Sequence, residues 1–168
     1  MSIIKNFIII IFFATFTSQV NAEEVKKMGT HKDWETFIIN SDTSKVCFAQ
    51  SKPVLQSPKS SSREARLFIS FRPGEKITDE ISVTGGYEFN NKNMVIATSG
   101  KNKYKFDLMQ DGFAWMTSKK SEKKMIKTMK KGSRIMITGH NQNGSQTKDH
   151  YSLLGFTKAY NATRANCS

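Results

Sequence analysis

The sequence predicts a mainly β protein, an antiparallel sandwich or barrel of short strands. Apolar and polar residues alternate over many short segments, which is the period of a strand with one buried face. Turn-forming residues separate these segments at close spacing, and the chain does not alternate strands with long helices. Its 168 residues are enough for one domain with a single buried core.

The alternation marks a series of strands. It is clearest around Ile69, where Leu67, Ile69 and Phe71 fall on one face, and Pro73 with Gly74 ends this strand. The predicted strands cover residues 34–39, 45–51, 66–71, 81–83, 94–98, 103–109, 113–116, 134–139 and 149–154.

Two segments are predicted to lack regular structure. Residues 23–32 are polar and are expected to be loose, and residues 52–62 combine two prolines with a serine run, which is typical of an irregular loop. Aromatic residues next to lysines could stack on nucleic acid, but strand alternation explains them as core residues. The residues expected in the core on this ground are Tyr104, Phe106, Leu108 and Trp115.

A helical period appears only late in the chain. Ser121 is the predicted N-cap, and Gly132 is predicted to end the helix. Between them Met125, Ile126 and Met129 fall within one stripe, which predicts an amphipathic helix packed on the sandwich. The lysines projected onto its other side are Lys119, Lys120, Lys123, Lys124, Lys127, Lys130 and Lys131. A second short helix is expected just before the last cysteine.

The N-terminus is typical of a secretory signal peptide. Lys5 precedes an almost wholly apolar stretch, 7–16, and small residues follow up to Ala22. The stretch is shorter than the roughly 20 residues that span a bilayer. We therefore expect a signal peptide over 1–22 and a single domain over 23–168, with a retained membrane anchor as the alternative.

Cysteine use and charge agree with export. Cys47 and Cys167 are the two cysteines, and an oxidising compartment favours a disulfide between them, the alternative being two free thiols. The net charge of +12 attracts polyanions, although solubility alone could explain it. Export argues against nucleic acid as the partner. The candidate partners that remain are acidic envelope polymers, lipopolysaccharide phosphates, host glycans and a protein partner.

The lysine side of the late helix is the predicted binding surface. It could dock on an anionic surface, or it could simply face water as most charge runs do. The residues predicted to make the contact are Lys120, Lys123, Lys124, Lys127 and Lys131.

Catalysis is not indicated by the sequence. His140 and His150 flank the last hairpin beside Asp149, so an envelope enzyme or metal-handling protein built on them is the alternative function. However, no serine lies in a nucleophile-elbow motif, and bonded cysteines leave no thiolate. We expect neither a metal nor a cofactor, and the oligomeric state is left open.

Short motifs in a fixed order suggest a family. The C-terminal series is Met129-Lys130-Lys131-Gly132, a strand, the Gly144 loop, Tyr151-Ser152-Leu153, Gly155-Phe156-Thr157 and Cys167. Upstream, the pieces are residues 46–51 with Pro53, Phe71-Arg72-Pro73, residues 86–89 and Ala114-Trp115. From Trp34 to Cys167 the chain resembles the invasion-associated locus B family, although Asn143 and Ser145 depart from that family's usual loop.

The resemblance implies an immunoglobulin-like β-sandwich with one or two short helices near the C-terminus. It also implies a periplasmic or surface location, a link to host-cell invasion in pathogenic members, and no known enzyme activity. We therefore expect an envelope protein with a binding or structural role.

Overall fold

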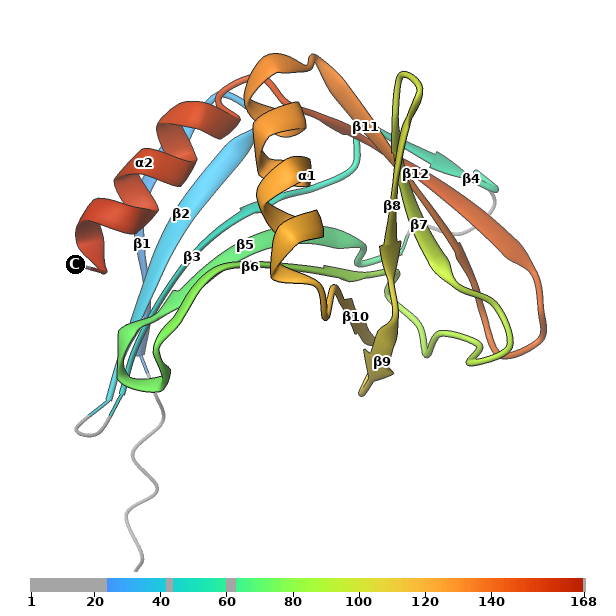
Figure 1. Ribbon diagram of the computed structural model, residues 1–168, viewed down its shortest axis with the longest axis horizontal. Coiled ribbons are helices and arrows are strands. Elements are labelled where there is room, and N and C mark those ends of the chain that lie inside the picture. Colours follow the sequence, from blue (N-terminus) through green and yellow to red (C-terminus); the bar gives the residue numbers. More distant parts are fainter. Residues whose placement is uncertain (1–23, 42–43, 60–62, 168) are drawn as a thin grey trace, which may run out of the picture.

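The computed structural model describes residues 24–41, 44–59 and 63–167, which form two antiparallel sheets and two α-helices (Figure 1). The prediction of a mainly β sandwich with helices near the C-terminus is confirmed. The predicted signal peptide, 1–22, lies outside the described residues.

The larger sheet has seven strands in the order β1-β2-β3-β5-β6-β10-β9. They are β1 (Glu24–His31), β2 (Trp34–Asn40), β3 (Lys45–Ser51), β5 (Arg66–Arg72), β6 (Ile77–Thr84), β10 (Phe113–Trp115) and β9 (Leu108–Gln110). A 3-10 turn, η1 (Pro73–Glu75), joins β5 to β6. The central strands alternate buried and partly exposed residues, so one face of the sheet looks into the core.

The smaller sheet has five strands in the order β4-β12-β11-β7-β8. They are β4 (Leu55–Ser57), β12 (Gln146–Ser152), β11 (Arg134–His140), β7 (Val95–Ser99) and β8 (Asn102–Phe106). The helices are α1 (Lys119–Lys131) and α2 (Phe156–Asn166). The last hairpin starts its second strand at Gln146, three residues before the predicted start.

The helices complete the layer opposite the larger sheet. Figure 1 shows α2, α1 and the smaller sheet side by side across one face of the larger sheet. The fully buried ring of Trp34 on β2 packs edge-on against Phe156 of α2, with centroids 4.9 Å apart. The hydroxyls of Tyr104 on β8 and Thr128 on α1 share a hydrogen bond of 2.7 Å. The core is therefore enclosed by sheet and helix together.

The predicted disulfide is present. Cys47 of β3 bonds to Cys167 just after α2, with Cα atoms 5.8 Å apart and 120 residues between them. Both residues are buried. The bond therefore fastens the last helix onto the inner face of the larger sheet.

The prediction that residues 23–32 are loose was wrong. Residues 24–31 form the edge strand β1, paired with β2 through a turn at Lys32, whose φ is 58°. Most side chains of β1 are exposed, so the strand leaves no alternating pattern in the sequence. Gly155, at φ 90°, packs against this turn, because a Cβ there would lie 1.8 Å from the carbonyl oxygen of His31.

Two further segments differ from their predictions. Residues 55–57 of the predicted loop form β4, which pairs with β12. The predicted strand 103–109 is divided at Asp107, where the chain crosses from the smaller sheet to the larger one. The Asp107 carboxylate accepts hydrogen bonds from the backbone N–H (2.9 Å) and hydroxyl (2.8 Å) of Thr117, which lower its pKa. Beyond the crossing, Leu108 is 48% exposed rather than buried.

Trp115 was also misplaced by the prediction. Ala114 is the residue of β10 that is buried in the core, and Trp115 lies on the opposite, outward side of the larger sheet, where it is half-buried. On a short strand with apolar residues on both sides, alternation does not identify the inner face.

Candidate functional site

The helix α1 carries the predicted binding residues, and it begins one turn earlier than expected. Ser118 is the N-cap, because its hydroxyl accepts a hydrogen bond from the backbone N–H of Ser121 at 3.3 Å. The predicted cap Ser121 thus lies in the first turn. Gly132 ends the helix as predicted, and its N–H donates to the Thr128 carbonyl at 2.8 Å.

The buried side of α1 holds one charged residue that the sequence analysis missed. Met125, Ile126 and Met129 enter the core as predicted, and Glu122 lies with them at 1% exposure. Its Oε1 accepts the backbone N–H of Ile81 at 3.1 Å. Burial raises the pKa of Glu122, against the opposing effect of this hydrogen bond. Its spacing of three, four and seven residues from the three apolar side chains could have revealed this position.

Two of the lysines on α1 are used in contacts within the domain. The Nζ of Lys119 lies 3.0 Å from Oε2 of Glu122. The Nζ of Lys130 lies 3.6 Å from the centre of the Tyr160 ring, and burial lowers the pKa of Lys130. Neither ammonium group is therefore free to turn wholly toward solvent.

The other five lysines of α1 form what we call the lysine face. They are Lys120, Lys123, Lys124, Lys127 and Lys131. All five are exposed, and within the described part of the chain none forms an ion pair with a carboxylate. The row from Lys120 to Lys131 extends about 16 Å at 1.5 Å per residue. The structure thus leaves the predicted set exposed and uncompensated.

The strand β8 adds further positive charge beside the lysine face. The Tyr104 hydroxyl lies 3.4 Å from the Lys124 carbonyl oxygen, which places the strand against this helix. Lys103 and Lys105 are exposed on either side of Tyr104. Near the start of α1, Lys119 and Lys123 line a cavity of about 190 Å³ together with Asp79 of β6 and others.

The two hairpin histidines do not come together. In the register of β11 with β12, His140 lies opposite Gln146, whereas His150 lies opposite Met136. Four residues therefore separate them along the strand, about 13 Å at the usual rise. Among the residues that the structure describes, no three His, Cys, Asp or Glu side chains gather as a metal site would require.

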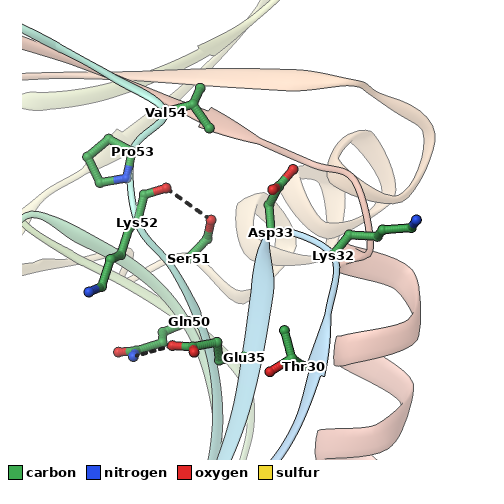
Figure 2. A pocket seen from close by; sticks show the side chains of 9 residues that line it. All are labelled: Thr30, Lys32, Asp33, Glu35, Gln50, Ser51, Lys52, Pro53 and Val54. Carbon is green, nitrogen blue, oxygen red and sulfur yellow. Dashed lines mark hydrogen bonds between the residues drawn. The ribbon is translucent and has the colours of Figure 1, made fainter.

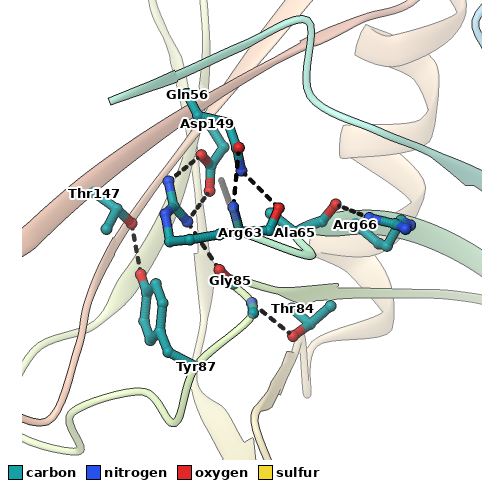
Figure 3. Close-up of polar contacts among 10 residues, drawn as sticks. Gln56, Arg63, Ala65, Arg66, Thr84, Gly85, Tyr87, Thr147 and Asp149 are labelled. Carbon is teal, nitrogen blue, oxygen red and sulfur yellow. Dashed lines mark hydrogen bonds and ion pairs between the residues drawn. The ribbon is translucent and has the colours of Figure 1, made fainter. Parts of the chain in front are cut away.

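Asp149, which precedes His150 in the sequence, pairs with Arg63. It faces the interior, where its Oδ2 lies 3.0 Å from Nη1 of Arg63, and its other oxygen contacts Nη2 (Figure 3). Nη1 also donates to the Gly85 carbonyl at 2.9 Å, and the guanidinium lies 5.6 Å from the centre of the Tyr87 ring. The Tyr87 hydroxyl shares a 2.6 Å hydrogen bond with Thr147. This cluster fixes β12 against the segment before β5.

A cavity of about 340 Å³ lies between the β1–β2 turn and the segment after β3 (Figure 2). Lys32 and Lys52 line it, but their ammonium groups point in opposite directions. On its floor, Glu35 pairs with Lys27, whose hydrogen bond lowers the pKa of Glu35, and Gln50 donates to it at 3.4 Å. The cavity therefore presents no converging set of charged groups.

These features define a class of protein: a disulfide-closed, two-sheet β domain completed by two helices, one of which presents a basic face. The family model described as Invasion associated locus B (IalB) protein matches residues 34–164. The chain therefore belongs to the invasion-associated locus B family, as the order of its motifs predicted. Searches of curated proteins and of solved structures gave no match.

Proposed function

We propose that this chain is an exported cell-envelope protein that binds an anionic polymer through the lysine face, and that it is not an enzyme. The observation that carries the proposal is the positive charge of five exposed lysines on one helix, none of which forms an ion pair with a described residue. A lysine near an anionic surface contributes about 1 kcal/mol. Five of them can therefore give useful affinity without a deep pocket.

Export is supported by the N-terminal pattern and by the disulfide. The segment 1–22 has the three-part layout of a secretory signal. Disulfides persist in oxidising compartments such as the periplasm or the cell surface. Within the described residues, no helix has the length and apolar character needed to cross a membrane. The family's name associates it with invasion, so the polymer could belong to the bacterium's own envelope or to a host surface.

A binding role is favoured over catalysis by the geometry of the reactive residues. Cys47 and Cys167 are consumed in the disulfide, and His140 and His150 are held apart by the strand register. Asp149, the acid next to His150, is already paired with Arg63. A metal or catalytic site built on the histidines would need His140 and His150 in contact, and the strand register keeps them apart.

Heparin, as a soluble polyanion, tests the proposal. The wild-type protein should bind it at low salt and lose affinity steeply as salt rises, because released counterions supply much of the free energy. The variant Lys120→Glu/Lys124→Glu/Lys127→Glu should lose at least a hundredfold in affinity. The matched control is Lys26→Glu/Lys92→Glu/Lys148→Glu, which reverses three exposed lysines elsewhere.

Both variants lower the net charge equally, so their difference isolates α1. The control should retain most of the wild-type affinity. Equal losses in the two variants would show that net charge alone attracts the polymer. Wild-type binding that resists high salt would also contradict charge docking. Thermal melting of all three proteins confirms that each is folded.

A further inference from the structure

A row of aromatic rings crosses the outward side of the larger sheet. It consists of Phe37, Phe48, Phe68, Phe113 and Trp115, contributed by β2, β3, β5 and β10. Successive ring centroids lie 5.1, 6.1, 5.9 and 5.6 Å apart. All five side chains are half-buried and lie outside the core cluster. We call this surface the aromatic face; it is turned away from both helices (Figure 1).

The five rings pack against one another along the row, with interplanar angles between 14° and 60°. Phe37 and Phe48 stack at an interplanar angle of 14°, and Phe113 and Trp115 lie at 30°. A sugar ring stacks on an open aromatic face, whereas each ring of this row already packs against a neighbouring ring. Exposed apolar residues lie at the margins of the row: Val25, opposite Ile39, is 54% exposed, and Leu108, opposite Trp115, is 48% exposed. The continuous apolar surface suits a protein contact.

The charges around the aromatic face are balanced. Three ion pairs lie there, Lys27–Glu35, Arg66–Glu64 and Arg72–Glu80, and Arg72 also contacts Glu75. Lys52 acts on Glu35 as a further cation. The cations are Lys27, Lys52, Arg66 and Arg72, and the carboxylates are Glu35, Glu64, Glu75 and Glu80. Four charges of each sign cancel, so the excess of +12 belongs to the rest of the chain.

The balance of charge around the aromatic face indicates which partner covers it, namely a second copy of this chain. Two copies of a strongly basic chain repel each other across most of their surfaces. Across the aromatic face that repulsion is absent, while apolar rings are available for burial. Seven strands span about 29 Å, and seven-residue strands run about 24 Å, so the sheet face offers roughly 700 Å². A standard interface needs about 800 Å² per partner.

We propose that the aromatic face is the contact surface between two copies of this chain, joined about a two-fold axis. Both copies then present the same patch, and Val25 and Leu108 lie at the margins of the contact. The interface is modest in size, so the dimer is reversible rather than permanent. This inference is independent of polymer binding by the lysine face.

Sedimentation velocity over a range from low micromolar to several hundred micromolar tests the proposal on the purified protein. The wild type should pass from monomer to dimer. Val25→Lys/Leu108→Lys should raise the dimer dissociation constant at least tenfold, because it places new positive charges on both copies. Val54→Lys/Leu154→Lys is the matched control, since these residues are equally apolar, 55% and 60% exposed, and lie outside the aromatic face.

Tryptophan fluorescence gives a second measurement. Trp34 is fully buried in the core, so a change in quenching by acrylamide with protein concentration reports on Trp115. Quenching of the wild type should fall as dimer forms, and in Val25→Lys/Leu108→Lys the same fall should need at least tenfold higher protein concentration.

Three results would overturn the dimer proposal. The first is a monomer at every concentration. The second is a dimer that Val25→Lys/Leu108→Lys leaves intact, which would place the contact elsewhere, for example on the edge of β1. The third is a monomer whose Trp115 fluorescence responds to neutral dextran, which would make a glycan the occupant.

Discussion

The lysine face and the aromatic face are both exposed surfaces of one domain, yet they are assembled in opposite ways. The lysine face comes from 12 consecutive positions of one helix, Lys120 to Lys131, and within the described residues none of its lysines forms an ion pair. The aromatic face gathers rings from four strands spread between Phe37 and Trp115, and its charges cancel. One surface attracts at a distance, and the other can act only on contact.

The two surfaces differ in the force by which they can bind a partner: the lysine face by long-range electrostatic attraction, and the aromatic face by close packing. An uncompensated positive surface raises encounter rates with polyanions and is weakened by salt. A balanced apolar surface gains its free energy from buried area, which salt changes little. Changes to the shared scaffold should therefore disturb both surfaces, whereas changes within α1 should disturb only one.

The largest effect is expected from removing the disulfide. Replacing Cys47 and Cys167 by alanine should cost about 4 to 5 kcal/mol of unfolding free energy, because the bond closes a loop of more than a hundred residues. Cys47 precedes Phe48 on β3, so the aromatic face loses its support as well. Urea denaturation measures the loss. A change below about 1 kcal/mol would show that the core holds α2 without the bond.

Breaking the buried ion pair should cost nearly as much. Asp149→Ala leaves the Arg63 guanidinium buried without its carboxylate, a change worth about 3 to 5 kcal/mol. The double variant Arg63→Met/Asp149→Leu removes both charges and should recover much of the stability. Urea denaturation of the two variants compares them. If the double variant is no more stable than the single one, the unpaired charge is not the cause.

Loss of the N-cap of α1 should affect the lysine face and leave the aromatic face unchanged. Ser118→Ala removes the hydrogen bond to the Ser121 N–H and should cost about 1 kcal/mol. The loss is local to α1, so hydrogen exchange should quicken in its first turn. Dimerisation through the aromatic face should not change. A weaker dimer in this variant would show that the two surfaces are coupled.

The smallest effect concerns pH. Burial raises the pKa of Glu122 in the folded protein, so the folded chain binds this proton more tightly than the unfolded chain. The contribution to stability is fully present below the unfolded pKa and is lost as pH rises toward the folded pKa. Glu122→Gln keeps an acceptor for the Ile81 N–H but cannot titrate. The part of the stability loss with rising pH that is due to Glu122 should therefore be absent in this variant. Melting temperatures measured across mildly acidic pH test it, and identical profiles for variant and wild type would contradict the assignment.

Patterns within one continuous segment were predicted well from the sequence. The apolar stripe of Met125, Ile126 and Met129 and the opposing lysines follow from the helical period alone. Strand 66–71 was equally clear, because its alternation is regular and Pro73 ends it. The family motifs and the disulfide were also recovered, since two cysteines allow only one pairing within the chain.

Features that depend on tertiary neighbours were not predicted. The strand β1 is held by backbone hydrogen bonds to β2, and its exposed side chains carry no signal. The partners Arg63 and Asp149 lie 86 residues apart, and nothing local links them. The aromatic face was missed for the same reason: Phe48 and Trp115 lie far apart in sequence, and both sides of their strands are apolar.

The close packing of Gly155 against the turn after β1 determines how the N-terminal strand can come loose. Because the turn at Lys32 packs against the start of α2, the His31 end of β1 is held by this contact in addition to its pairing with β2. The strand β1 should therefore detach from β2 more readily at its Glu24 end than at its His31 end. A neighbouring protein could then gain access to the first residues of β1 without disturbing the far end of the hairpin.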